Sequence, residues 1–331
     1  MVFDLNEANS VVTQFIMKEI PDALQRANYL WYVLSGKNKE YIDGGKNIQF
    51  AIKTLANQSQ GFINGSTDIL DMNVNQQMVY GTLNWKYHYS NVSITLDDMT
   101  KTSDTPRAIK SLLEAKKDMG KADAIRQLSS AVQNSVTLNP KSFDGLADAI
   151  SSGAYAGLTA GDFPLDPTAY APIVDTTSTT VNYSTIAPMI TKLKGRAQTS
   201  GAGSVNGKVD LIISNSAVYQ AFMTTQQPNQ RFFEVKDLEA GFDGVKVNGC
   251  SWFVDEFTPG SADGVTSDNF LYVLTTDTLK MAYKYGLDNK SPFDGVVRIP
   301  NQPINGSQMF FAGNLVCNNR RLNGVFQNLI A

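Results

Sequence analysis

The sequence contains few residues whose type and spacing could perform catalysis. His88 is the single histidine, and it lies in a segment rich in tyrosine and tryptophan. One histidine cannot build a multi-histidine metal site, so we expect it to have a structural role. The sequence has no G-x-S-x-G, Walker A, H-E-x-x-H or EF-hand pattern. We therefore expect no catalytic, cofactor-binding or metal-binding residue, no enzymatic activity and no cofactor.

Two pairs of adjacent carboxylates, Asp97 with Asp98 and Asp255 with Glu256, could in principle supply acid–base chemistry. Neighbouring residues in a strand point to opposite faces, so neither doublet forms a natural catalytic pair. We expect both doublets on turns or at the rim of the fold. The short glycine loop at 201–204 lacks the second spacing and the preceding strand of a dinucleotide site, which favours a flexible connection.

Arg320 and Arg321 directly follow an apolar run. In one interpretation, one arginine lays its aliphatic stem along the surface and the other forms a salt bridge. In the other interpretation, the pair forms ion pairs between subunits. The sequence pattern is compatible with both.

The composition excludes one class of function. Of the 331 residues, 42% are hydrophobic and 18% are charged, and the net charge is −3. No lysine or arginine block is present, which argues against a basic nucleic-acid-binding module. A shell that merely encloses nucleic acid remains compatible with this charge, because it gains nothing from binding phosphates tightly. The low charged fraction, with abundant amides and hydroxyls, suits surfaces that contact other protein.

Cys250 and Cys317 both lie in apolar, strand-like runs, so we expect buried free thiols and synthesis in a reducing, cytosolic compartment. The N-terminal segment carries Asp4 and Glu7 and has no basic region or continuous apolar core. It is therefore not expected to be a signal peptide. No apolar run approaches the length of a transmembrane helix, so no membrane association is expected.

A long helix over 102–134 is the element that must position the rest of the chain. Asp104 is a candidate cap, and Pro106 stands where a first helical position would lie. Such a helix would run roughly 40 Å, which suggests a rod in a flat, extended subunit. Gly120 interrupts the pattern and predicts a bend. The apolar residues of this helix recur at mostly three- or four-residue steps: Ile109, Leu112, Leu113, Met119, Ala122, Ile125, Leu128 and Val132.

The N-terminal part, 1–36, is expected to be helical in two stretches separated by Pro21. Two interpretations remain open for it. It is either an arm that docks on its own subunit or on a neighbour, or an ordinary helical hairpin on the same core.

Two alternating segments, 48–52 and 78–89, predict the strands of a long hairpin whose tip is the polar stretch 57–77. An isolated hairpin is marginal in water, so we expect this projection to lie on another subunit.

The second half of the chain predicts an α/β unit followed by β structure. Helices are expected at 183–193 and 214–223, with Asn215 or Ser216 as the cap of the latter, around a short buried strand at 209–213. Asn248 and Gly249 predict a two-residue hairpin turn, and 309–317 predicts a central strand buried on both faces. Further strands are expected at 270–274, 279–285 and 322–329. Asn323 and Gly324 predict a hairpin turn or a bulge.

In this order, the chain resembles the major capsid proteins of tailed bacteriophages over nearly its whole length. The resemblance rests on the order of the elements and on several phrases together. These phrases are Asp43-Gly44-Gly45, Leu96-Asp97-Asp98, Phe143-Asp144-Gly145-Leu146, 209–215, 245–252, 257–260 and 310–321.

The resemblance implies an α+β, elongated phage-capsid-type fold in five segments. These are an N-terminal arm at 1–38, an extended β-hairpin loop at 39–95, a peripheral domain with the long spine helix at 96–175, an axial α/β domain at 176–294, and a return to the peripheral domain at 295–331. It implies copies of the chain that form hexamers and pentamers of an icosahedral shell around double-stranded DNA, in a virion assembled in the bacterial host cytoplasm. Portal, scaffolding and decoration proteins are further implied partners.

Some members of this family crosslink through a lysine and an asparagine. Lys46 and Lys53 lie in the corresponding hairpin, but no matching catalytic acid is found, so we expect no covalent crosslink. Two alternatives to the phage shell are a nanocompartment shell of the encapsulin type with the same fold, and a non-viral α/β binding module.

Overall fold

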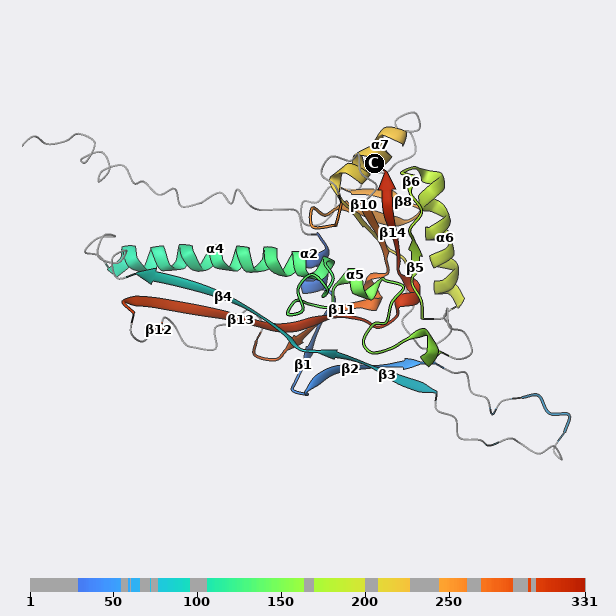
Figure 1. Ribbon diagram of the computed structural model, residues 1–331, viewed down its shortest axis with the longest axis horizontal. Helices are drawn as coiled ribbons and strands as arrows, with labels where there is room; N and C mark the ends of the chain where they lie inside the picture. The colour runs from blue at the N-terminus through green and yellow to red at the C-terminus, as the bar shows by residue number, and fades with distance from the viewer. Residues whose placement is uncertain are drawn as a thin grey trace, which may run out of the picture.

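The structure is a computed structural model of the 331-residue chain, and it is elongated rather than round (Figure 1). It describes residues 29–54, 59, 61–65, 72, 77–95, 106–163, 170–199, 208–226, 244–260, 269–287, 297–298 and 302–330. The expectations for 1–28, for Asp97 and Asp98, and for the loop at 201–204 lie outside these residues.

The described helices are α2 (Tyr29–Gly36), α4 (Pro106–Gln133), α5 (Leu146–Ala149), α6 (Tyr183–Thr199) and α7 (Ser216–Gln226), with short 3-10 helices η1 (Ala160–Asp162), η3 (Thr276–Thr278) and η4 (Arg320–Leu322). The described strands are β1 (Lys39–Ile42), β2 (Asn47–Lys53), β3 (Met78–Asn84), β4 (Lys86–Thr95), β5 (Ile173–Asp175), β6 (Thr179–Thr180), β7 (Leu211–Ser214), β8 (Gly244–Val247), β9 (Cys250–Val254), β10 (Asn269–Leu274), β11 (Leu279–Lys284), β12 (Val297–Arg298), β13 (Ile304–Cys317) and β14 (Gly324–Ile330). None of the described helices is both long enough and apolar enough to span a membrane.

The predicted long helix is confirmed as α4, which has 28 residues and begins at Pro106. Proline suits a first helical position because its missing N–H would have no partner there. α4 continues through Gly120 without a break, and the bend predicted there stays a prediction. A Cβ at Gly120 would lie 2.7 Å from Cγ2 of Val92 on β4, so the glycine lets the helix approach the strand closely.

A five-stranded sheet lies beside α4 and contains the longest strand, β13. β13 pairs antiparallel with β11 on one side and with β4 on the other, and β1 extends the sheet by pairing parallel to β11. Residues 311–317 of β13 are all buried, which confirms the predicted central strand. Figure 1 shows α4, β4 and β13 reaching together out of the body of the molecule.

A seven-stranded sheet forms the second part, with β10 between β14 and β7. Its buried residues alternate between two hydrophobic clusters. Ile212 and Trp252 pack on the side of α6 and α7, whereas Ile213 and Phe253 pack into the cluster shared with α2, α4 and β13. This period of two is what strands covered on both faces require. One continuous core therefore links the two sheets.

Local signals in this second part are confirmed. Asn215 caps α7, because its Oδ1 accepts a hydrogen bond from the backbone N–H of Val218 at 3.0 Å. Asn248 and Gly249 have φ values of 48° and 80°, and both lie in the turn between β8 and β9. Two positive φ values are the signature of the two-residue turn that matches the twist of a hairpin.

The predicted hairpin is confirmed in its outer part, where β2 and β3 pair antiparallel from Asn47 opposite Asn84 to Lys53 opposite Met78. The expectation that residues 86–89 continue this hairpin is wrong. These residues belong to β4, which pairs with β13 from Lys86 opposite Gly313 onward. The strand pattern breaks at Trp85, whose Nε1 donates a hydrogen bond to the carbonyl oxygen of Gly45.

The prediction of a hairpin turn or a bulge at Asn323 and Gly324 is also wrong. β13 and β14 lie in different sheets, and η4 carries the chain from one to the other. Asn323 fixes this crossing, because its Oδ1 accepts from the Thr275 N–H and its Nδ2 donates to the Asn319 carbonyl.

Candidate self-association surfaces

The β2–β3 hairpin projects from the body and carries its apolar residues unevenly (Figure 1). At its base, Ile48 and Leu83 are buried in the main core. Further out, Ile52 and Val79 are only half-buried, against a small separate cluster. Tyr80 is 62% exposed. The hairpin therefore presents apolar surface that its own subunit does not cover.

The stretch of chain that connects β2 to β3 carries further exposed apolar residues. Phe62 and Met72 are almost fully exposed, and Ile63 is 55% exposed. Exposed apolar side chains in a group mark a surface for contact with other protein more often than a free surface.

A second exposed aromatic group lies on β4. Tyr87 and Tyr89 point away from α4, and 57% and 65% of their surfaces are exposed. Lys284 on β11 places its Nζ 5.8 Å from the ring centroid of Tyr87 and 5.9 Å from that of Trp85. Tyrosine is enriched where proteins meet, since its ring buries a large area and its hydroxyl still bonds water or partners.

Helix α2, in the segment predicted to be an N-terminal arm, packs on its own subunit. Leu30, Trp31 and Leu34 of α2 are buried in the main core. Tyr29 stacks on Phe253 of β9, with ring centroids 3.6 Å apart. Residues 29–36 thus dock on their own subunit, which both interpretations allow, and residues 1–28 lie outside the described part.

Asp255 is not the rim residue that was expected. It follows β9, is 1% exposed, and accepts hydrogen bonds from the backbone N–H groups of Leu30 and Phe257. Burial raises the pKa of Asp255 to about 6, with a smaller contribution from Glu256, while the bonds from Phe257, Leu30 and the Gln133 side chain oppose the rise. The sequence signal for this burial was an acid placed directly after the apolar run 252–254.

Arg320 follows neither of the two interpretations drawn from the sequence. It is 3% exposed, and its guanidinium donates hydrogen bonds to the carbonyl oxygens of Ala149, Ser151 and Gly153. The rings of Tyr155 and Tyr170 lie 5.5 and 5.1 Å from the guanidinium carbon. Arg320 therefore holds the loop after α5 against η4 and is unavailable for a contact between subunits. Arg321 is half-buried beside it.

The other chemistry-bearing residues are dispersed. In the described ranges, no group of three or more histidine, cysteine, aspartate or glutamate side chains could hold a metal ion. Cys250 and Cys317 are buried free thiols, as predicted, and burial raises the pKa of the Cys317 thiol to about 12. Lys46 and Lys53 are exposed at the two ends of β2. The expectation that they form no crosslink stays a prediction.

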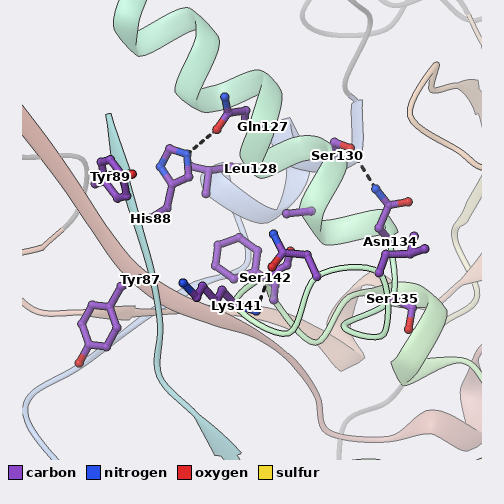
Figure 2. Close-up of a pocket in the computed structure, with 14 residues that line it drawn as sticks. Tyr87, His88, Tyr89, Gln127, Leu128, Ser130, Asn134, Ser135, Lys141 and Ser142 are labelled. Carbon is purple, nitrogen blue, oxygen red and sulfur yellow. Dashed lines mark hydrogen bonds between the residues drawn. The ribbon is translucent and has the colours of Figure 1, made fainter. Parts of the chain in front are cut away.

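A groove lies between β4, the C-terminal half of α4 and residues 134–143 (Figure 2). His88 points from β4 toward the helix, and its Nε2 lies 3.0 Å from Oε1 of Gln127. Leu128 and Phe143 are buried at its base. This contact agrees with the structural role expected for His88. The groove itself was not predicted from the sequence, because its walls come from segments far apart in the chain.

Comparison with known sequences finds no match: no protein-family model matches the chain, and no curated protein matches it. Similarity is found among solved structures. The capsid of cyanophage A-1(L) is 12% identical with a TM-score of 0.65, over 97% of this chain and 98% of that chain. The capsid of a native GTA particle is 10% identical with a TM-score of 0.58, over 98% of this chain and 100% of that one.

A third similar structure is the SrpI encapsulin complex from Synechococcus elongatus PCC 7942. It is 7% identical with a TM-score of 0.59, over 100% of this chain and 97% of that chain. At such low identity the likeness concerns the fold. The chain has the α+β fold that tailed-phage capsid proteins share with encapsulins, and the predicted fold class is confirmed.

Proposed function

We propose that this chain is a structural major capsid protein that assembles into an icosahedral shell around the double-stranded DNA of a tailed bacteriophage. The observation that carries the shell role is the overlap of fold with capsid-type proteins, which leaves almost no part of either chain unmatched, and the proposal of a phage capsid is supported by the several phage capsids among the similar structures. A chance likeness in one domain would not include the projecting hairpin, the long helix and both sheets together.

Assembly follows from surfaces that one subunit leaves exposed. The hairpin and the tyrosines of β4 present apolar area at two separate places on the elongated subunit. When the hairpin of one copy covers part of the next, each contact is weak, but the contacts add because a closed symmetric shell engages all of them at once.

The division into arm (1–38), extended loop (39–95), peripheral domain (96–175), axial domain (176–294) and returning segment (295–331) remains part of this proposal. Strand pairing crosses these segments. β1 and β11 both join the sheet of β13, and β14 joins β10 in the seven-stranded sheet. The sheets are therefore shared between segments.

The proposal places the protein in the virion capsid after synthesis in the host cytoplasm. Its main partners are further copies in hexamers and pentamers, with portal, scaffolding and decoration proteins as additional partners. The net charge of −3 favours only weak, non-specific contact with the packaged DNA.

The similarity to the SrpI encapsulin complex supports a second candidate, a nanocompartment shell with the same fold. The two candidates differ in what the shell contains. Electron microscopy of purified particles, followed by nuclease treatment and extraction, separates them. A shell that protects long double-stranded DNA supports the phage capsid, whereas a shell that contains a co-purifying protein and no DNA supports the nanocompartment.

The remaining alternative, a non-viral α/β binding module, predicts a different result from the same preparation. Such a protein would form a small oligomer of uniform size and no shell at any concentration.

A further inference from the structure

The groove beside β4 has the size and the walls of a binding site. Its volume is about 630 Å³, within the range of roughly 300–1,000 Å³ that is typical of ligand sites. One wall is the strand β4 and the opposite wall is the helix α4. The side-chain contact between His88 and Gln127 crosses from strand to helix (Figure 2). The residues that line the groove come from β4, from the C-terminal half of α4 and from 134–143.

The edge of β4 presents backbone groups to this groove. Ala312 of β13 stands opposite Tyr87, and its N–H donates a hydrogen bond to the carbonyl oxygen of Leu287 at 3.0 Å, on the side away from β4. In an antiparallel pair that does not exchange hydrogen bonds, both residues direct their backbone groups outward. Tyr87 therefore directs its N–H and C=O away from β13, and so does Tyr89 two residues later.

A second contact agrees with this alternation. The carbonyl oxygen of Ser93, six positions along the same edge from Tyr87, is reached by Nζ of Lys116 on α4 at 3.5 Å. Figure 2 shows the rings of Tyr87 and Tyr89 turned away from the groove, so these two residues line it with their backbone.

The groove wall carries a lysine, and the carboxylate of Asp148, which is not itself a lining residue, accepts a hydrogen bond from Oγ of the lining residue Ser135 at 2.6 Å. Of the described lining residues, Lys141 is the charged one, and none is a carboxylate. Lys86 adds a further cation nearby, held by a hydrogen bond of 2.7 Å from its Nζ to the Pro140 carbonyl oxygen. The base of the groove is apolar, with Leu128 and Phe143.

We propose that this groove binds an extended, acidic peptide segment of a partner protein, which adds as a strand beside β4. Its backbone pairs with Tyr87 and Tyr89, an apolar side chain rests on Leu128 and Phe143, and a carboxylate faces Lys141. Strand addition of this kind takes affinity from the backbone and specificity from alternate side chains. The inference concerns a groove within one subunit, and only the comparison of subunits with assembled particles rests on the proposed shell function.

The test uses the full-length chain and a fluorescent eight-residue peptide, followed by fluorescence anisotropy. Every second residue of the peptide is leucine or glutamate in turn, with threonine between them, so that leucine and glutamate share one face of the added strand. A matched peptide carries lysine in place of glutamate. We expect the glutamate peptide to bind at least about tenfold more tightly than the lysine peptide, and Lys141→Glu to weaken it about tenfold. Equal binding of both peptides, or no binding of either, overturns the proposal.

A backbone variant tests strand addition directly. Tyr89→Pro removes one outward N–H while leaving the ladder to β13 intact, since proline is tolerated at the free edge of a sheet. We expect about tenfold weaker binding for Tyr89→Pro and less than about threefold for Tyr89→Ala, which removes only the ring. Thermal unfolding of each variant shows whether it is folded. If Tyr89→Pro unfolds the chain, Tyr87→Pro and Tyr87→Ala are compared instead. Equal loss of peptide affinity in the alanine and proline variants overturns strand addition.

The same peptide distinguishes a separate partner from a neighbouring copy. Binding both to dissociated subunits and to assembled particles supports a separate partner. Binding to dissociated subunits alone shows that a second copy fills the groove in the assembly, and this result overturns the assignment.

Discussion

The backbone N–H of Leu30 donates a hydrogen bond to Oδ2 of Asp255 at 3.3 Å, although 225 positions separate the two residues in the chain. Gln133, at the C-terminal end of α4, bonds the same carboxyl group. Asp255 thus joins helix α2, the C-terminal end of α4 and the end of β9 in the seven-stranded sheet. Three elements that must keep their relative positions in an elongated subunit meet at one buried acid.

Acidification should stabilise this junction. Burial raises the pKa of Asp255 to about 6 in the folded chain, above its ordinary value of 3.8, so the folded state favours the protonated form. Protonation of Asp255 then adds to the free energy of unfolding in full below pH 4, and this addition is lost as the pH rises through 6. We expect wild type to gain on the order of 2–3 kcal/mol relative to Asp255→Asn between pH 7.5 and pH 4. Urea unfolding of unassembled subunits at several pH values measures this difference, and parallel pH profiles of the two proteins would contradict the assignment.

Two helical glycines should respond in opposite ways to alanine. At Gly120, a Cβ would lie 2.7 Å from the stiff side chain of Val92, so we expect Gly120→Ala to destabilise the subunit by roughly 1–3 kcal/mol. At Gly195 in α6, a Cβ would meet nothing within 4 Å, and Gly195→Ala should stabilise by about 0.5–1 kcal/mol. Denaturant unfolding of both variants gives the signs. Stabilisation by both would show that α4 does not pack closely on β4.

Replacing Arg320 should destabilise the subunit far more than replacing its neighbour. Arg320→Ala removes a buried side chain and leaves the buried carbonyl group of Ala149 without its donor, and the carbonyl groups of Ser151 and Gly153 lose the same donor, so we expect a loss of roughly 3 kcal/mol. Arg320→Lys keeps the charge but not the planar fork, and it should recover only part of this loss. Arg321→Ala is the control, with an expected change under about 1 kcal/mol. Equal effects at the two positions would contradict the role given to Arg320.

The parts of this fold that could be predicted from the sequence are those in which neighbouring residues decide the structure. The long helix, the Asn215 cap and the turn at Asn248 all follow from short-range spacing and turn chemistry. Strand partners were not predictable in the same way. Whether residues 86–89 continue a hairpin or pair with β13 depends on a strand more than 200 positions away.

The same dependence on distant segments explains why the burial of two charged residues was not predicted. Asp255 and Arg320 look like surface charges in sequence, and they are buried because segments far along the chain supply their hydrogen-bond partners. The exposed tyrosines of β4 were predicted as members of a strand, but the face they occupy follows from pairing with β13. The groove beside them is formed by β4, α4 and residues 134–143, and the relative positions of these segments could be seen only in the structure.

The hairpin should be needed for assembly and dispensable for folding. Deleting 57–77 removes the exposed Phe62, Ile63 and Met72 and leaves the buried base of the hairpin at Ile48 and Leu83. We expect a soluble subunit with an unfolding transition close to that of wild type and no large particles in size-exclusion chromatography. Substituting Phe62→Ser alone is the milder companion variant and should slow assembly. Normal shells from the deletion variant would show that the hairpin tip makes no necessary contact.

The central claim is that copies of this chain cover each other's exposed surfaces in a closed shell. Sedimentation velocity of the purified wild-type protein over a dilution series tests this claim most directly, together with electron microscopy of the same samples. The account predicts a fast-sedimenting boundary of uniform hollow particles, which decreases on dilution in favour of small capsomers or subunits. A single slow boundary of compact monomers at every concentration, with no particles in the images, would contradict it.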